Sequence, residues 1–286
     1  MIEAELSGED GVGGVKIVRS DDRYGDLRGL ELAVELYRSV TPIPTEIEGI
    51  PVTNENALER GLSACFNEGD FDPVPGGVVV EPGGVSRFGT TCCRTFVDDE
   101  RRLLTAAHLW NACSAASRGE PLFQSDRRIG RVESFHRGYD VAVVDPGDRV
   151  EVADTIKLET DRRLPVSGTL TEWGVALYLA EGKEILNMGV SSGLTRGRLS
   201  AAYVEEGWNQ CVDFDGHGVE ARYQNVEGDS GGPVFVVHEG RAYLVAAQQM
   251  WVDRLGTDCG DNVVGDRGRG TAAYHLADEL GLRFSS

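Results

Sequence analysis

The sequence predicts an all-β protein from residue 86 onward, built from many short strands. From residue 86 onward the apolar runs are short and are separated by Gly, Asp and Pro, a pattern typical of barrels built from many short strands. A helix is expected near the end of the chain, from Thr271 to Leu282. Residues 1–85 precede this pattern and are expected to form a small α+β module, which gives the domains 1–85 and 86–286.

The N-terminal module contains three segments with a structural signal. Residues 30–37 alternate apolar and polar side chains, which favours a strand, but a helical spacing also fits, so both assignments stay open. Residues 42–52 contain several prolines and predict a rigid turn followed by a short extended segment. The stretch from Asp70 to Gly84 is rich in Gly and Pro and predicts the linker to the first barrel.

The stretch Gly228-Asp229-Ser230-Gly231-Gly232-Pro233 predicts a nucleophile held in a tight turn. Glycine lets the backbone approach a substrate carbonyl and adopt conformations that a Cβ would hinder. The N–H groups of Gly228 and Ser230 can then converge on an oxyanion, the charge that acyl transfer must stabilise. A plain structural turn also fits this stretch alone, so the upstream residues decide between the two interpretations.

A serine hydroxyl needs a base to remove its proton, and His108 is the expected base. It follows the apolar run Leu103–Ala107, which predicts a buried strand with the imidazole at its end. Asp140 lies where a loop turns into the apolar run 141–144, and it is the expected carboxylate that orients the imidazole. The three residue types in this order indicate nucleophilic catalysis.

Other polar residues have simpler interpretations. Asp145 is a rival acid, but it precedes a Pro-Gly turn and so belongs to the exit of the strand. His136 is expected in a surface loop. His217 lies in an Asp- and Gly-rich stretch that lacks the later glutamate and the spacing of an EF-hand. No Cys-x-x-Cys pair occurs, which argues against a zinc site. We therefore expect no metal and no organic cofactor.

Three motifs occur in the order His, Asp, Ser: Thr105-Ala106-Ala107-His108, Tyr139-Asp140-Val141-Ala142 and Gly228-Asp229-Ser230-Gly231-Gly232-Pro233. Together they resemble the trypsin-like (chymotrypsin-fold) serine proteases. Residues 189–197 and 274–282 resemble the G-x-T-T-G-x-x-x-G segment and the C-terminal helix of the streptogrisin-like branch. The resemblance covers roughly the last two thirds of the chain. It implies two six-stranded antiparallel barrels, over residues 86–150 and 165–270, with the active site between them. It also implies a serine endopeptidase that acts on a peptide or protein substrate.

The resemblance also implies two disulfides, Cys93–Cys113 beside His108 and Cys211–Cys259 beside Ser230, with Cys65 and Cys92 left over. Both spacings are looser than is usual in the family. The alternative, six reduced and buried cysteines that act as small apolar side chains, stays open.

The specificity pocket departs from the family pattern. Gln224 stands at the pocket-floor position where tryptic enzymes carry an acid, so a preference for Arg or Lys is not expected. Gln248, Gln249 and Met250 fall where the family has a small, glycine-containing wall. We expect Gln224 and Gln249 to contact the substrate, and a small or medium uncharged residue to occupy the P1 position.

Asp229 requires a partner, because an unpaired buried carboxylate beside the oxyanion hole is costly. The streptogrisin-like branch uses a buried arginine just before its G-x-T-T-G segment, where this chain has Asn187 and Met188. The expected substitutes are Arg196, Arg198 or a newly cut N-terminus.

The composition is strongly acidic, with 47 Asp and Glu against 28 Lys and Arg and a formal charge of −19. Such a surface repels nucleic acids and anionic membranes, which excludes binding to either by simple charge. Lysine occurs only at Lys16, Lys157 and Lys183, and this composition favours a haloarchaeal protein over an acidic protein from a GC-rich genome. The acidic first residues carry no signal-peptide pattern, which favours a cytoplasmic location, with an extracellular one as the alternative.

Two other functions stay open beside the endopeptidase. One is a non-catalytic binding or regulatory protein whose cleft is occluded by residues 1–85, and the other is a protease that cuts only its own linker. The N-terminal module itself is expected to be a removable pro-region, a permanent accessory domain or a covering layer on the barrel.

Overall fold

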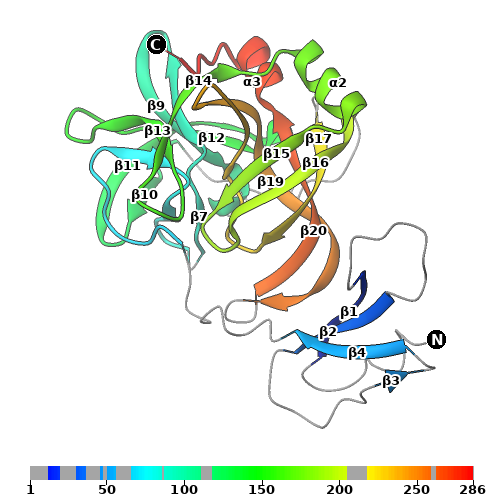
Figure 1. Cartoon of the computed structure of the whole chain (residues 1–286). Helices are drawn as coiled ribbons and strands as arrows, with labels where there is room; N and C mark the ends of the chain where they lie inside the picture. Colours follow the sequence, from blue (N-terminus) through cyan, green and yellow to red (C-terminus); the bar gives the residue numbers. More distant parts are fainter. Residues whose placement is uncertain are drawn as a thin grey trace. The chain divides into compact units, whose positions relative to one another are not determined.

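A computed structural model of the chain describes residues 12–19, 30–36, 46–47, 50–55, 66–85, 87–110, 118–204, 218–258 and 262–285 (Figure 1). The chain divides into two compact units, Met1–Ala64 with Leu255–Val263 and Cys65–Arg254 with Val264–Ser286. None of the described helices is long and apolar enough to cross a membrane.

The first unit contains a four-stranded sheet in the order β1-β2-β4-β3. Its strands are β1 (Val12–Arg19), β2 (Leu30–Leu36), β3 (Glu46–Ile47) and β4 (Ile50–Glu55). The strand assignment of residues 30–36 is thus the correct one of the two, and β4 is the expected extended segment. Every described residue of this unit belongs to a strand, so the helical part of the expected α+β module lies outside the described residues.

The second unit begins with a curled, antiparallel seven-stranded sheet in the order β7-β6-β10-β11-β12-β9-β8. Its strands are β6 (Val79–Pro82), β7 (Gly89–Thr90), β8 (Cys93–Val97), β9 (Glu100–Ala106), β10 (Pro121–Gln124), β11 (Arg127–His136) and β12 (Val141–Asp145). Leu103, Leu122, Ile129 and Val144 are fully buried inside it. A short 3₁₀ helix, η2 (Ala107–Trp110), continues β9, and another, η3 (Arg137–Tyr139), joins β11 to β12.

The other barrel closes on itself with six strands, because β18 pairs with both β15 and β19 at the two ends of the order β18-β15-β16-β17-β20-β19. The strands are β15 (Glu184–Gly189), β16 (Gly193–Val204), β17 (Gly218–Val226), β18 (Pro233–His238), β19 (Arg241–Asp258) and β20 (Asn262–Ala272). Strands β5 (Val74–Gly76), β13 (Val152–Lys157) and β14 (Arg163–Thr169) extend the same sheet.

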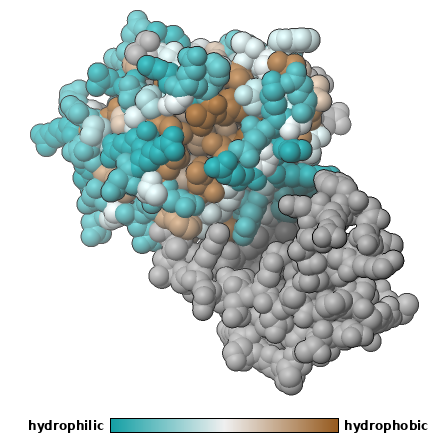
Figure 2. Space-filling view, viewed as in Figure 1, coloured by the Kyte–Doolittle hydropathy of each residue, from teal (hydrophilic) through white to brown (hydrophobic). Residues whose placement is uncertain are grey.

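The coloured part of the face drawn in Figure 2 is mostly hydrophilic around a central group of apolar residues.

Two helices accompany the closed barrel. Helix α2 (Glu172–Glu181) begins at Thr171, whose hydroxyl accepts a hydrogen bond from the N–H of Gly174 at 3.1 Å, and ends at Gly182 in the left-handed region. Helix α3 (Ala273–Leu280) confirms the helix expected at the end of the chain. It packs onto the core through Ala273 and Leu276.

The expected linker from Asp70 to Gly84 is part of the barrels instead. Strand β5 within it pairs with β13, and β6 pairs with β7 and β10. Val74, Val78 and Val80 are fully buried, so the apolar run outweighs the Gly and Pro content that suggested a linker. The compact unit accordingly begins at Cys65, earlier than the domain boundary expected at residue 85.

Candidate active site

His108 and Asp140 form a buried pair. The imidazole Nδ1 lies 2.7 Å from Asp140 Oδ2, and the main-chain N–H of His108 donates to Asp140 Oδ1 at 2.8 Å. Each side chain is 5% exposed. Two bonds to one carboxylate fix the plane of the ring and assign the proton to Nδ1, so Nε2 is the nitrogen left to exchange a proton.

The pairing of β9 with β12 brings these two residues together. Ala106 and Val141 are partners in the register, so the residues just beyond them, in η2 and at the end of η3, lie side by side. Asp140 has φ 49° and ψ 43°, a left-handed conformation that is uncommon for a residue with a Cβ. Its N–H donates to Arg137 O and its carbonyl accepts from Ala107 N, both at 3.1 Å. These bonds hold the conformation from both sides.

Ser230 lies in the tight turn between β17 and β18. Three bonds close the turn: Asp229 N to Val226 O at 3.0 Å, Gly232 N to Asp229 O at 2.9 Å, and Gly231 N to Gln248 O at 2.7 Å. Gly228 has φ +102°, and a Cβ there would lie 2.3 Å from the Phe88 ring. Within the described part of the chain, the N–H groups of Gly228 and Ser230 donate to no partner, as oxyanion donors require.

The serine turn is docked on the first barrel beside the strand that carries the histidine. The N–H of Thr90 donates to Ser230 O and its hydroxyl donates to Gly228 O, both at 2.8 Å. A Cβ on Gly231 would lie 2.3 Å from Thr105 Oγ1, at the end of β9. The hydroxyl of Ser230 donates to Gln249 O at 3.2 Å. Among the described residues, no hydrogen bond joins this hydroxyl to His108.

Solved structures with a similar architecture are bacterial proteases. Protease A of Thermobifida fusca matches with a TM-score of 0.55 and 17% identity over 74% of this chain and 98% of its own. The Cellulomonas bogoriensis chymotrypsin matches with a TM-score of 0.53 and 19% identity over 74% and 98%. The Nocardiopsis protease matches with a TM-score of 0.55 and 17% identity over 76% and 100%. The chain has the chymotrypsin fold. No protein-family model and no curated protein matches it significantly by sequence.

Asp229 is the buried carboxylate that follows Gly228 in this chymotrypsin fold, and main-chain amides surround it. Its Oδ1 accepts from the N–H groups of Ser191 (2.9 Å) and Ser192 (3.0 Å), and its Oδ2 accepts from that of Val226 (2.7 Å). Burial raises the pKa of Asp229, and these hydrogen bonds oppose the rise. The partners of Asp229 are therefore three main-chain amides, those of Ser191, Ser192 and Val226.

The expectation that Arg196 or Arg198 pairs with Asp229 is therefore wrong. Arg196 forms an exposed ion pair with Glu184 at 2.7 Å. Arg198 is also exposed. A strand residue that points to solvent cannot reach a carboxylate inside the barrel, and the register of β15 with β16 sets that direction.

The two glutamines expected to contact substrate differ in position. Gln224 is exposed on β17. Gln249 is fully buried, and its side-chain amide donates to Tyr139 O and to Thr271 Oγ1. Its main-chain carbonyl, rather than its side chain, is the part of Gln249 next to Ser230. Nothing in the spacing of the sequence indicated Tyr139 or Thr271 as neighbours.

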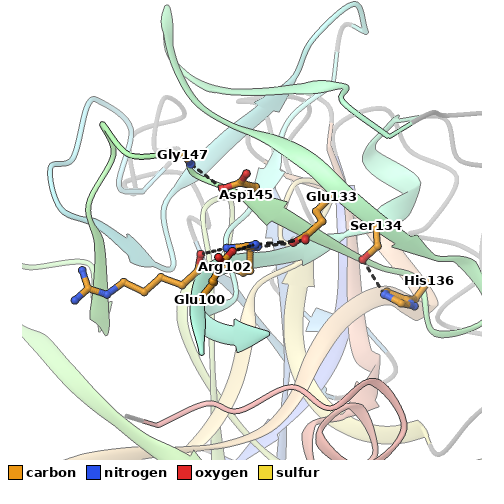
Figure 3. A network of polar contacts seen from close by, with 8 residues as sticks. Glu100, Arg102, Glu133, Ser134, His136, Asp145 and Gly147 are labelled. Carbon is orange, nitrogen blue, oxygen red and sulfur yellow. Dashed lines mark hydrogen bonds and ion pairs between the residues drawn. The ribbon is translucent and has the colours of Figure 1, made fainter. Parts of the chain in front are cut away.

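Figure 3 shows two of the other candidates, both engaged locally. Asp145 accepts a hydrogen bond from Gly147 N at 2.8 Å, as expected for the exit turn. His136 Nε2 lies 2.9 Å from Ser134 Oγ, and the ring is half-buried at the end of β11 rather than in a loop. Burial lowers its pKa, and Arg118 lowers it further. His217 lies outside the described residues.

Cys92 and Cys93 are buried free thiols. The disulfide that the resemblance implies for Cys93 is therefore wrong, because Cys93 lies inside the core on β8. Burial raises the pKa of Cys93, and the neighbouring Cys92 raises it further, so Cys93 stays protonated. The remaining four cysteines, Cys65, Cys113, Cys211 and Cys259, lie outside the described residues.

Proposed function

We propose that this chain is a serine endopeptidase with His108, Asp140 and Ser230 as its catalytic residues. The observation that carries the proposal is the buried His108–Asp140 pair, with 2.7 Å between Nδ1 and Oδ2, held beside the docked turn that contains Ser230. The chymotrypsin fold of the chain supports it, because proteases of this fold combine the same residue types in the same chain order.

Each residue has a distinct part in the proposed reaction. His108 Nε2 takes the proton of Ser230 as its oxygen attacks the peptide carbonyl, and later passes that proton to the leaving amine. Asp140 keeps the Nδ1 proton in place and stabilises the imidazolium. The N–H groups of Gly228 and Ser230 donate to the oxyanion of the tetrahedral intermediate. The acyl group then remains on Ser230 as an ester. His108 Nε2 takes a proton from water as the water oxygen attacks this ester, and returns the proton to the serine oxygen when the ester bond breaks.

The hydroxyl of Ser230 must turn before it can attack. It donates to Gln249 O at 3.2 Å rather than to His108 Nε2 among the described residues. Rotation about the Cα–Cβ bond of serine is inexpensive, and catalytic hydrogen bonds in unliganded enzymes often form only when substrate binds. The bond to Gln249 O is consistent with a resting form of the nucleophile.

The same bond supports a second candidate, a binding or regulatory protein on a protease fold. In such a protein the bond from Ser230 to Gln249 O would persist, and His108 would never receive the serine proton. We further propose a small or medium uncharged P1 residue, because Gln224 supplies no negative charge for Arg or Lys.

Covalent labelling with a fluorophosphonate probe tests the proposed function. Peptide mapping is expected to find one adduct, on Ser230, that is lost in Ser230→Ala and strongly slowed in His108→Ala. Ser167→Ala is the matched control, because Ser167 Oγ accepts a hydrogen bond from Arg241 on the exposed surface and has no part in the proposed reaction. A folded chain that acquires no adduct would favour the binding protein.

A further inference from the structure

Gln249 contacts both ends of the proposed catalytic machinery. Its main-chain carbonyl accepts a hydrogen bond from the hydroxyl of Ser230. Its side-chain amide donates to the carbonyl of Tyr139, in the peptide group that precedes Asp140. We propose that Gln249 is a positioning residue, which fixes the Tyr139–Asp140 peptide so that the Asp140 carboxylate faces His108. This inference rests on the proposed function and extends it to a residue outside the triad.

The side chain of Gln249 forms a closed set of three hydrogen bonds, here called the Tyr139 clamp. Gln249 Nε2 donates to Tyr139 O and to Thr271 Oγ1, and Thr271 Oγ1 donates to Tyr139 O at 2.7 Å. Gln249 and Thr271 are both fully buried. Tyr139 O accepts from both residues. The reverse orientation of the Gln249 amide would set Oε1 against this carbonyl oxygen with no proton between the two acceptors, so the amide nitrogen faces it.

The clamp acts on a strained point of the backbone. Asp140 is in the left-handed region. Without contacts that hold it, the Tyr139–Asp140 peptide would turn toward a more common backbone conformation. The carbonyl of that peptide is bonded by the clamp, and its N–H donates to Arg137 O at 3.1 Å. The Tyr139 ring also packs edge-on against His275, with 5.4 Å between ring centroids. Both ends of the peptide and the adjacent ring are therefore fixed.

The direction of the Asp140 carboxylate follows from this peptide. Its two oxygens accept from the N–H and the Nδ1 of His108 at 2.8 and 2.7 Å, distances that tolerate little rotation of the residue. If the clamp is removed, the peptide can turn toward an ordinary conformation and carry the carboxylate with it. The imidazolium then loses part of its stabilisation. The loss should appear in the rate of the reaction and in its pH dependence.

The test compares Gln249→Met with Gln124→Met. Methionine has nearly the volume of glutamine and cannot donate to Tyr139 O. Gln124 is the matched control, because it is also fully buried and its Oε1 accepts from Phe71 N at 2.7 Å, on a strand away from the serine turn. The measurement is the second-order rate constant for fluorophosphonate labelling of Ser230 as a function of pH, with circular dichroism as the check on folding.

The expected result is labelling slowed by about 10²-fold in Gln249→Met, with the midpoint of the pH profile moved to lower pH. Gln124→Met should keep the wild-type rate and midpoint even if it lowers the melting temperature equally. If the wild type is labelled and Gln249→Met shows the same rate and midpoint, the inference is overturned while the proposed function stands. An unlabelled wild-type chain would overturn the proposed function and the inference with it.

A second pair of variants keeps the inference open to refutation if Gln249→Met does not fold. Thr271→Val removes the other donor to Tyr139 O, whereas Thr271→Ser keeps a hydroxyl in the same place. Thr271→Val should label more slowly and at a lower midpoint, and Thr271→Ser should recover most of the rate. Equal behaviour of the two variants would show that the clamp does not position Asp140.

Discussion

The main-chain N–H of Thr90 donates a hydrogen bond to the carbonyl oxygen of Ser230 at 2.8 Å. The Thr90 hydroxyl donates to Gly228 O at 2.8 Å and accepts from Val190 N at 3.2 Å. One fully buried residue of the first barrel thus contacts both the serine turn and the segment that surrounds Asp229. This contact holds the turn that contains the proposed nucleophile against the first barrel.

Replacement of Thr90 by valine is predicted to weaken this contact between the first barrel and the serine turn. The change leaves Gly228 O and Val190 N without partners, and we expect the free energy of unfolding in urea to fall by about 1–3 kcal/mol. Labelling of Ser230 should also slow. Thr95→Val is the control, because the Thr95 hydroxyl donates to Arg283 O at 3.0 Å and lies away from the serine turn. Equal labelling rates in the two variants would contradict the prediction.

Gly231→Ala is predicted to disrupt the docking of the serine turn. The new Cβ would lie 2.3 Å from both Thr105 Oγ1 and Thr90 O, at a residue with φ +89°. We expect a loss of about 2–5 kcal/mol in the free energy of unfolding, together with the loss of labelling. Gly147→Ala has a positive φ of +68° but open space around its Cβ, so it should cost only about 1–2 kcal/mol. Similar costs for the two would show that strain alone, not contact, matters at Gly231.

The stability of the fold is predicted to depend on the protonation of His136. Burial lowers its folded-state pKa below the ordinary 6.5, so the unfolded chain binds this proton more readily. The contribution of His136 is therefore complete above pH 6.5 and is lost as the pH falls from there toward the lowered pKa. Urea unfolding at about pH 7 and about pH 5 should show a larger loss for the wild type than for His136→Gln. An identical loss in both would refute the prediction.

Salt is predicted to stabilise the chain. A formal charge of −19 implies repulsion within the folded state, and raising ionic strength from about 0.1 M to about 1 M shortens the screening length from about 10 Å to about 3 Å. The urea midpoint should rise over this range. A midpoint that stays constant or falls would argue against a protein adapted to strong salt.

The sequence suffices to propose His108, Asp140 and Ser230 as catalytic residues. His108 follows an apolar strand, Asp140 precedes one, and Ser230 lies among glycines, so each is indicated by its own neighbourhood. The partners of Asp229 could not be found in this way, because Ser191 and Ser192 bind it through main-chain amides that every residue possesses. A hydrogen bond from the main chain cannot be predicted from the type of the residue that makes it.

Composition misleads at the expected linker, and residue type is silent on main-chain contacts at Gln249. The Gly and Pro content of residues 70–84 suggested a linker, but the valines among them fill the barrel interior. The sequence predicts Gln249 beside the substrate, but it does not tell which part of the residue lies next to the serine turn. The side chain is buried, and the main-chain carbonyl accepts the hydrogen bond from the hydroxyl of Ser230, a contact that any residue type could make.

The amides around Asp229 have a consequence for how the serine turn acquires its shape. When a buried carboxylate is neutralised by a charge that cleavage creates, the turn becomes ordered only after that event, and processing acts as a switch. Here three main-chain N–H groups, those of Ser191, Ser192 and Val226, donate to the Asp229 carboxylate. These donors belong to the turn between the folded strands β15 and β16 and to strand β17, so the support of the serine turn that they provide forms together with the barrel.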